Sequence, residues 1–151
     1  ESEVVFVDDY AHHPEELRAL ITGARSLFEK QKLVLVFQPH LFSRTRDLAD
    51  GFAEVLDTAD EVILLPIYPA RELPIEGVSS EMILNKMKLK NKTVMSKDEL
   101  KTSIKSLVRG DTNQGSGLVG ENTNKGGMVF ITAGAGDIDA MLNELKELIL
   151  K

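Results

Sequence analysis

The segment FVDDYAHHPEEL, near the N-terminus, gathers acidic, phenolic and imidazole groups directly after an apolar run. Asp8 and Asp9 can accept hydrogen bonds from hydroxyl groups, and His12 and His13 can exchange protons near neutral pH. Tyr10 adds an aromatic ring with a polar tip. These types suit polar-ligand binding, proton transfer or metal coordination. Structural roles compete with these, because one acid can cap the following helix and the histidines can lie on the surface.

A second set of polar side chains follows the next apolar run, in FQPHLFSRTRDL. Arg44 and Arg46 each present a planar fork of N–H donors that matches a carboxylate or a phosphate. His40 stands beside them. The set therefore predicts an anion-binding site. The structural alternative is that the arginines form ion pairs with Asp47 or Asp50 on a solvated helix face.

Two further segments combine polar groups with tight backbone geometry. IYPARELPIEGV contains Tyr68, Arg71 and Glu72, and ITAGAGD ends in Asp137. GAGD resembles half of a dinucleotide-binding fingerprint, but it lacks the third glycine and follows the last apolar run instead of the first. We expect the small residues to let the backbone approach a neighbouring loop or a ligand, with Asp137 capping the last helix.

The elements that must position these groups are strands and helices in alternation, because short β-branched apolar runs alternate with stretches of helical period. This predicts an α/β fold, with a Rossmann-like, mostly parallel sheet flanked by helices in a single domain. Strands are expected over 4–7, 33–38, 61–67, 92–95 and 127–136. Helices are expected over 14–30, 43–59, 79–87, 96–109 and 137–151. Ligands bind at the carboxyl ends of parallel strands, so the four polar segments should meet at one edge of the sheet.

Two helices carry clear sequence signals, and one stretch carries none. Ser96 and Glu99 form a capping box. The first helix has proline in its first turn and an apolar stripe made of Leu17, Leu20, Ile21, Ala24, Leu27 and Phe28. The polar, glycine-rich stretch over about 110–127 lacks periodicity, and we expect a flexible surface loop there.

The composition excludes several classes of protein. The 151 residues are enough for one core, and the net charge of -6 argues against nucleic acid as a partner. The absence of cysteine excludes disulfides and thiolate metal sites. No apolar run approaches the roughly 18 residues of a membrane span, and no signal-peptide pattern is present, so we expect a cytoplasmic location and no membrane partner.

The segments DDYAHHPEE, FQPHLFSRTRDL, IYPARELPIEGV and ITAGAGDID resemble, in that order, the C-terminal domain of the Mur ligases of peptidoglycan synthesis. The first motif is shared in form by several branches of the family. FQPH with SRTRDL, together with YPA, points to the branch that joins L-alanine to UDP-N-acetylmuramate. The resemblance covers nearly all of 1–151 except the polar loop.

The resemblance implies an ATP-dependent ligation in cell-wall synthesis, on which cell shape and cell division depend. ATP phosphorylates the muramoyl carboxylate, the amine of L-alanine attacks the acyl phosphate, and phosphate leaves. An N-terminal UDP-binding domain and a central ATPase domain share the work, while the C-terminal domain closes over ATP and positions the amino acid. The chain has no GxxxxGK[ST] motif, so the loop that cradles the phosphates and the residues that hold Mg are expected on those two domains. The chain by itself is expected to be inactive.

The resemblance also implies roles for single residues at the nucleotide. Asp9, Tyr10 and His12 match the first motif, and Asp9 is suited to accept hydrogen bonds from the ATP ribose hydroxyls. Tyr10 would line the nucleotide or the interdomain surface. His12 would hydrogen-bond either phosphate or the incoming alanine.

At the substrate, the implied binding residues are His40, Arg44, His12 and Arg46. Arg44 is expected to hold the α-carboxylate of L-alanine, with Arg46 as the weaker choice. The family commonly has a basic residue where this chain has Leu41, so one charge of that site is absent or supplied elsewhere. No catalytic residue and no metal ligand is assigned.

Three alternatives stay open. A muropeptide-recycling Mur ligase has similar motifs but tends to replace the histidine and following arginine of the FQPH segment. A metal-dependent phosphohydrolase would use Asp8, Asp9, His12, His13 and His40 as ligands, although adjacent histidines diverge and no HExxH-type spacing is present. A non-catalytic nucleotide-binding module of the same fold would use the sheet edge without chemistry.

Overall fold

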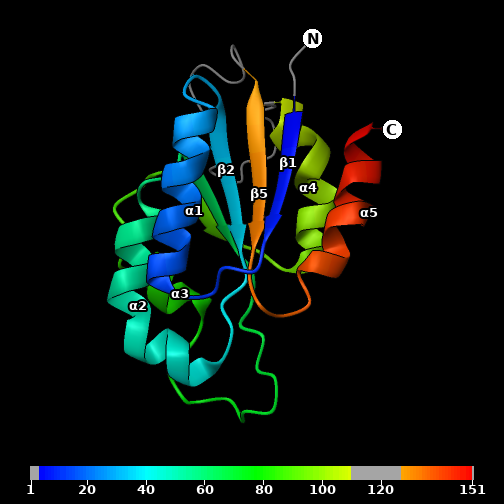
Figure 1. The fold of residues 1–151 in the computed structure, drawn as a ribbon. Coiled ribbons are helices and arrows are strands. Elements are labelled where there is room, and N and C mark those ends of the chain that lie inside the picture. The colour runs from blue at the N-terminus through cyan, green and yellow to red at the C-terminus, as the bar shows by residue number, and fades with distance from the viewer. Residues whose placement is uncertain (1–3, 110–126, 151) are drawn as a thin grey trace.

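The fold is a five-stranded, entirely parallel sheet with helices on both faces (Figure 1). This computed structural model describes residues 4–109 and 127–150, so the loop expected over about 110–127 lies almost wholly outside the described residues. Across the sheet the strands stand in the order β1-β5-β2-β3-β4. Their bounds are β1 (Val4–Asp9), β2 (Lys32–Phe37), β3 (Glu61–Leu64), β4 (Lys92–Val94) and β5 (Met128–Ala133). The predicted fold class is confirmed.

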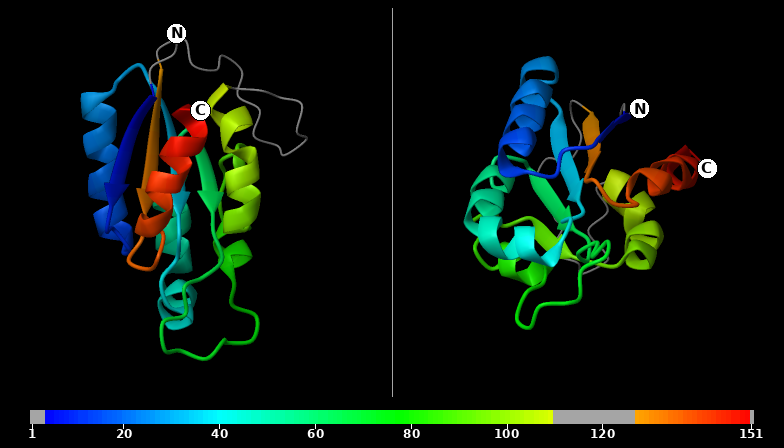
Figure 2. Two further views of the ribbon diagram at one scale, coloured as in Figure 1. Left: turned by 90° about the vertical axis from the view of Figure 1, so that its right-hand side faces the viewer. Right: turned by 60° about the horizontal axis from the view of Figure 1, so that its bottom comes forward.

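The direction of each crossover decides which face of the sheet a helix covers. From β1 to β4 the chain moves one way across the sheet, and α1, α2 and α3 cover one face; it then returns to β5, and α4 and α5 cover the other (Figure 2). Right-handed crossovers require this division. The helices are α1 (Pro14–Leu27), α2 (Phe42–Leu56), α3 (Ser80–Leu84), α4 (Lys97–Arg109) and α5 (Asp139–Leu150).

The central strand β2 is buried on both of its faces. Leu33, Leu35 and Phe37 lie in the apolar layer beneath α1, α2 and α3, whereas Val34 and Val36 lie in the layer beneath α4 and α5. All five side chains are fully buried. A continuous apolar run is typical of a parallel strand covered by helices on both sides. This burial fixes the register of β2 and therefore the position of the polar residues that follow it.

The first helix is shorter than predicted, and one member of its predicted apolar stripe is exposed, although Phe28 still packs against the core. α1 ends at Leu27, three residues before the predicted end, and Phe28 closes it by donating its backbone N–H to the carbonyl of Ala24 at 2.8 Å. Leu27 was placed in the stripe, but its side chain is 78% exposed. At about 100° per residue, Leu27 lies roughly 80° from Leu17 around the helix, at the flank of the buried face.

The capping box of α4 is confirmed. The backbone N–H of Ser96 donates to Glu99 Oε1, and the backbone N–H of Glu99 donates to Ser96 Oγ, each at 3.1 Å. This reciprocal pair fixes where α4 begins. Among residues 4–109 and 127–150, no helix is long and apolar enough to cross a membrane.

All four polar segments leave the sheet at one edge, as predicted. The carboxyl ends of β1, β5, β2 and β3 lie side by side, and the segments that follow them form the lower end of the molecule in Figure 1. An isolated parallel bridge between His40 and Tyr68 carries the pairing of the segments after β2 and β3 beyond the strands. The right-hand view of Figure 2 brings this carboxyl edge towards the reader.

Candidate functional site

The two acids at the end of β1 do not cap the following helix. Asp8 Oδ1 accepts a hydrogen bond from the hydroxyl of Thr132 on β5, at 2.7 Å. Asp9 Oδ1 accepts from the backbone N–H of Ala11 at 2.8 Å, which closes a short turn. Asp9 is exposed at the carboxyl edge, and this turn uses only one of its carboxylate oxygens. The capping role considered for one of the acids is therefore wrong.

His13 takes the capping role instead. It is the N-cap of α1, and its Nδ1 accepts the backbone N–H of Glu15 at 3.4 Å. The side chain is exposed. The structure therefore supports the alternative in which His13 is a surface residue with a structural role. His13 and His12 have different hydrogen-bond partners.

A row of four aromatic rings crosses the carboxyl edge from the end of β1 to the end of β3. The ring centroids of Tyr10 and His12 are 5.5 Å apart, and those of His12 and His40 are 6.1 Å apart, both edge to face. His40 is stacked on Tyr68, with 5.7 Å between centroids and 13° between planes. Residues from three separate strand ends are thus brought into contact, as the sequence predicted for Tyr10, His12 and His40.

Arg44 extends this row by contacting His40. Its Nη1 lies 3.1 Å from His40 Nδ1. Since a guanidinium group has no acceptor, Nδ1 of His40 must carry the lone pair, and the ring proton must lie on Nε2. Burial lowers the pKa of His40 below its ordinary value of 6.5, and the charges of Arg44 and His12 lower it further. His40 is therefore neutral at pH 7.

His12 has the opposite tautomer. Its Nδ1 lies 2.9 Å from the backbone carbonyl of Tyr10, which can only accept. Nδ1 must therefore be protonated, and in the neutral ring the lone pair lies on Nε2. Glu16 Oε1 is also 3.5 Å from His12 Nδ1. When both rings are neutral, the two facing rings thus differ: His12 has an acceptor at Nε2, and His40 has a donor there.

Arg46 does not join the cluster. Its Nε donates to Asp47 Oδ1 at 2.8 Å, and the side chain is about half exposed on α2. This is the ion pair that the sequence offered as the structural alternative for the arginines. Hydrogen bonding to Asp47 raises the pKa of Arg46 and lowers the pKa of Asp47. The contacts of the described residues do not support Arg46 as a substrate ligand.

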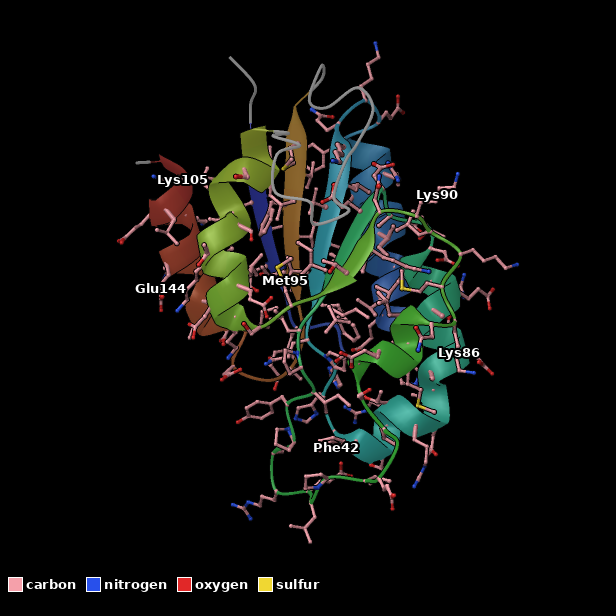
Figure 3. The ribbon with its side chains drawn as sticks, turned by 180° about the vertical axis from the view of Figure 1, so that it is seen from behind. Phe42, Lys86, Lys90, Met95, Lys105 and Glu144 are labelled. Carbon is pink, nitrogen blue, oxygen red and sulfur yellow. The ribbon has the colours of Figure 1, made fainter. Side chains whose placement is uncertain are left out.

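Glu72 is a residue of this edge to which the sequence analysis gave no role. Its Oε1 accepts the backbone N–H groups of Phe42 and Ser43 at 2.5 and 3.1 Å, and its Oε2 accepts the Ser43 hydroxyl. These hydrogen bonds, the Ser43 hydroxyl foremost, lower the pKa of Glu72 below its ordinary value of 4.5. Figure 3 shows the labelled Phe42 at the start of α2, next to the loop that carries Glu72.

The loop after β5 is held by an amide side chain from the loop after β2. Gln38 is 3% exposed, donates from Nε2 to Asp137 Oδ1 at 2.8 Å, and accepts the backbone N–H of Ile138 at 3.1 Å. Asp137 also pairs with Lys97 at 2.5 Å, and these contacts lower its pKa. The predicted capping by Asp137 is wrong, because α5 begins two residues later and the carboxylate is already bound to Gln38 and Lys97.

The small residues of GAGD do allow a close approach, as predicted. A Cβ on Gly136 would lie 2.6 Å from Gln38 Oε1 and 2.6 Å from Tyr68 Cγ. Beside this contact lies an open cavity of about 440 Å³, lined by Gln38, Pro66, Ile67, Tyr68, Pro69, Ser96, Lys97, Asp98 and Asp137. The glycine therefore lets the last loop pack against the ring that stacks on His40.

Across residues 4–109 and 127–150, no group of three or more histidine or acidic side chains is arranged to hold a metal ion. In particular, His13 is engaged at the start of α1 and Asp8 is bound to Thr132. The geometry thus gives no support to the phosphohydrolase alternative, which needs these residues as ligands.

Comparison with known proteins gives a family match across most of the chain. The model of the Mur ligase, glutamate ligase domain family matches residues 1–119. A UDP-N-acetylmuramate–L-alanine ligase from Cytophaga hutchinsonii is 48% identical over 145 residues, covering 96% of this chain and 27% of that protein. The ligase of the same name from Flavobacterium johnsoniae is 43% identical over 146 residues, covering 97% and 28%. The chain thus spans little more than a quarter of the length of these relatives.

Two solved structures share the fold. The crystal structure of a UDP-N-acetylmuramate-alanine ligase from Thermotoga maritima aligns with a TM-score of 0.62 and 27% identity, covering 97% of this chain and 26% of that one. A murein peptide ligase from Psychrobacter arcticus aligns with a TM-score of 0.67 at 16% identity, covering 98% and 28%. The second likeness shows the fold alone.

Proposed function

Because the chain belongs to the Mur ligase family through its glutamate ligase domain, we propose that it is the C-terminal domain of an ATP-dependent ligase that joins L-alanine to UDP-N-acetylmuramate in peptidoglycan synthesis. The observation that carries the proposal is the placement of Arg44 against a neutral His40 at the carboxyl edge. An always-charged fork at that edge suits the carboxylate of a small amino acid.

Arg44 is the proposed ligand of the alanine carboxylate. One of its N–H groups points to His40 Nδ1, and a guanidinium group has four more. Contact with His40 restrains the long side chain, so less rotamer freedom is lost when a carboxylate binds. Leu41 stands where the family commonly has a second basic residue. Arg44 is therefore the one basic side chain that we propose as a ligand of the alanine carboxylate.

His12 is the proposed partner of the alanine amine. Its lone pair on Nε2 can accept a hydrogen bond from an amino group, whereas a second donor at this place would repel it. An amine must be neutral when it attacks an acyl phosphate, and the Nε2 lone pair can accept a hydrogen bond from that neutral amine and so orient it. His40 Nε2, a donor, is suited to hydrogen-bond a substrate oxygen beside it.

Asp9 and Tyr10 are the proposed contacts of the nucleotide. Asp9 is exposed, and its turn hydrogen bond uses only Oδ1. Oδ2 can therefore accept a hydrogen bond from a ribose hydroxyl group. The Tyr10 ring is 67% exposed and offers a flat apolar surface. The described residues provide no acidic cluster for Mg, which we assign to the proposed central ATPase domain.

The carboxyl edge is also suited to being covered by another domain of the same protein. Of the three large hydrophobic side chains that are exposed in the described part of the chain, Tyr10 and Leu73 belong to segments at this edge. We propose that the domain closes over ATP and L-alanine, with UDP-N-acetylmuramate held by the other domains. Positioning of two bound reactants can supply about 7–11 kcal/mol of the barrier reduction, and closure keeps water from the acyl phosphate.

The alternative within the family is a muropeptide-recycling ligase. The curated relatives at 43–48% identity carry the name of the alanine-adding ligase, whereas the murein peptide ligase structure is only 16% identical. His40 and Arg44 also remain in the segment that the recycling branch tends to change. These observations favour L-alanine as the acceptor.

The test is an assay of ADP release by the longer protein that carries this domain. UDP-N-acetylmuramate and ATP are supplied with L-alanine, glycine, L-serine or the peptide accepted by recycling ligases, one acceptor at a time. Turnover that requires L-alanine is the expected result. A requirement for the peptide would identify the recycling ligase, and absence of turnover with every acceptor would contradict both assignments.

A further inference from the structure

We propose that Glu72 is a positioning residue that fixes the first turn of α2 and thereby holds Arg44 and His40 in the geometry that binds the amino-acid carboxylate. The inference rests on the proposed function for the role of that site, but the contacts that carry it are independent of any substrate. Glu72 comes from the loop after β3 and does not itself reach the ring row.

The first turn of α2 needs an external partner. Its N-cap residue is Leu41, which has no side chain to accept a hydrogen bond from the helix N-terminus. Leu41 also has φ of 75°, in the left-handed region that a residue with a Cβ rarely adopts. A conformation of this kind persists only where the surrounding structure enforces it. The start of α2 therefore lacks its own stabilisation.

Glu72 supplies the missing acceptor. It takes the N–H groups of Phe42 and Ser43, which have no partner inside the helix, and the Ser43 hydroxyl as well. A carboxylate is also favoured at a helix N-terminus by the helix dipole. Three contacts to one carboxylate restrict the first turn much more than a single cap would.

The same contacts restrain the two residues that flank this turn. His40 lies one residue before Leu41, and Arg44 one residue after Ser43. His40 is tied to the loop of Glu72 a second time, because Tyr68 donates its N–H to Pro39 at 2.8 Å and accepts the N–H of Leu41 at 2.8 Å. The segments after β2 and β3 are therefore joined at both ends of the turn, and Glu72 closes the outer end.

The first experiment measures the turn itself, in the 151-residue chain. In Glu72→Ala, the amide hydrogens of Phe42 and Ser43 should exchange at least about tenfold faster than in wild type, with little change in the central strands. The ¹⁵N signals of the His40 ring should move from an unprotonated Nδ1 towards a mixture of tautomers as Arg44 loosens. Glu76→Ala is the matched control, because Glu76 is an exposed acid of the same loop.

Glu72→Gln separates hydrogen bonding from charge. Its carbonyl oxygen can still accept both backbone N–H groups, and its amide can donate to the Ser43 hydroxyl oxygen. We expect this variant to keep most of the wild-type protection and the wild-type His40 tautomer. If Glu72→Ala leaves both readouts unchanged, or if Glu76→Ala changes them equally, Glu72 does not position the turn and the proposal is wrong.

The second experiment measures the consequence for catalysis in the longer protein. Glu72→Ala should raise the KM for L-alanine between about 10-fold and 100-fold, with the KM for ATP within about twofold of wild type. A merely structural role would reduce the active fraction, lowering kcat with KM unchanged, and that result would overturn the proposal. If wild type lacks alanine-dependent turnover, the proposed function fails, while the exchange and tautomer readouts still decide whether Glu72 holds Arg44 and His40.

Discussion

Nη1 of Arg44 lies 3.1 Å from Nδ1 of His40, which stands four residues earlier and just outside the helix that carries Arg44. The contact fixes the protonation of the ring, because only an unprotonated Nδ1 can face a guanidinium group. It also directs the arginine towards the row of aromatic rings instead of solvent. The position of the Arg44 charge and the tautomer of His40 therefore depend on one another at the proposed amino-acid site.

Arg44→Ala in the longer protein should raise the KM for L-alanine by about 10-fold to 100-fold. A hydrogen bond to a charged group contributes about 1.5–3 kcal/mol, and the substrate carboxylate would lose its main cation. Arg44→Lys should recover only part of the loss, since an ammonium group cannot match the carboxylate with a planar fork. ADP-release kinetics at varied alanine concentration measure both effects.

Arg46→Ala is the matched control for Arg44. It removes the same charge two residues later on α2, but from a side chain that is paired with Asp47. We expect its KM for L-alanine to stay within about twofold of wild type, because its guanidinium group is paired with Asp47 on the exposed face of α2. Equal effects of the two substitutions would contradict the placement of the amino-acid site at Arg44.

The pH dependence of alanine binding should reflect His40. Its folded-state pKa is lowered from 6.5, first by burial and then by the charges of Arg44 and His12. Stability that depends on neutral His40 is therefore fully present above pH 6.5 and is lost as pH falls through the lowered pKa. Below that pKa the protonated ring repels Arg44, so the KM for L-alanine should rise. An NMR titration of His40 measures the pKa directly.

His40→Asn separates this titration from others. The side-chain oxygen of asparagine can accept from Arg44 roughly where Nδ1 does, but it cannot be protonated in this range. The part of the pH dependence that comes from His40 should disappear in this variant. Titration of His40 at or above 6.5 in wild type would contradict the assigned contact with Arg44.

Much of the fold could be predicted because the strong signals are local. The β-branched runs, the capping box of Ser96 and Glu99, and the alternation of strands and helices each specify structure within a few residues. Leu27 shows the limit of such signals. Its position at the flank of the apolar stripe does not reveal that the helix ends there and leaves it exposed.

The site was predicted less completely, because its decisive contacts join residues far apart in the sequence. Strand ends could be counted, so the meeting of His12 and His40 was foreseen. The hydrogen bonds of Glu72 to the start of α2 span about 30 residues and have no sequence period. The sequence offered little warning, because the predicted helix over 43–59 begins at Ser43, a residue that can cap a helix, whereas α2 begins at Phe42 with Leu41 as its N-cap.

The 151-residue chain by itself should neither hydrolyse ATP nor form product. It has no phosphate-binding loop motif, and its described residues offer no acidic cluster for a metal ion. A closing domain can position substrates only against a second surface. Isothermal titration should detect ATP and L-alanine weakly at best. Measurable turnover by this chain would contradict the proposed division of work between domains.

Gly136→Ala should destabilise the chain and disturb the site at once. The new Cβ would meet Gln38 Oε1 and Tyr68 Cγ, each at 2.6 Å. Gln38 cannot turn away without losing its hydrogen bonds to Asp137 and Ile138, and Tyr68 is held by its stacking on His40. We expect a loss of about 1–3 kcal/mol in the free energy of unfolding, measured by urea denaturation.

Gly23→Ala is the control for the loss of a glycine. Gly23 lies inside α1, and a Cβ there would meet no atom within 4 Å. Alanine in a helix interior is favoured over glycine by about 0.5–1 kcal/mol, so this variant should be more stable than wild type. If Gly136→Ala were equally stabilising, the close approach of the last loop to Tyr68 would be wrong. Gly136→Ala should also disturb His40, because it would displace the Tyr68 ring on which His40 is stacked, and a stabilising substitution would rule out this effect as well.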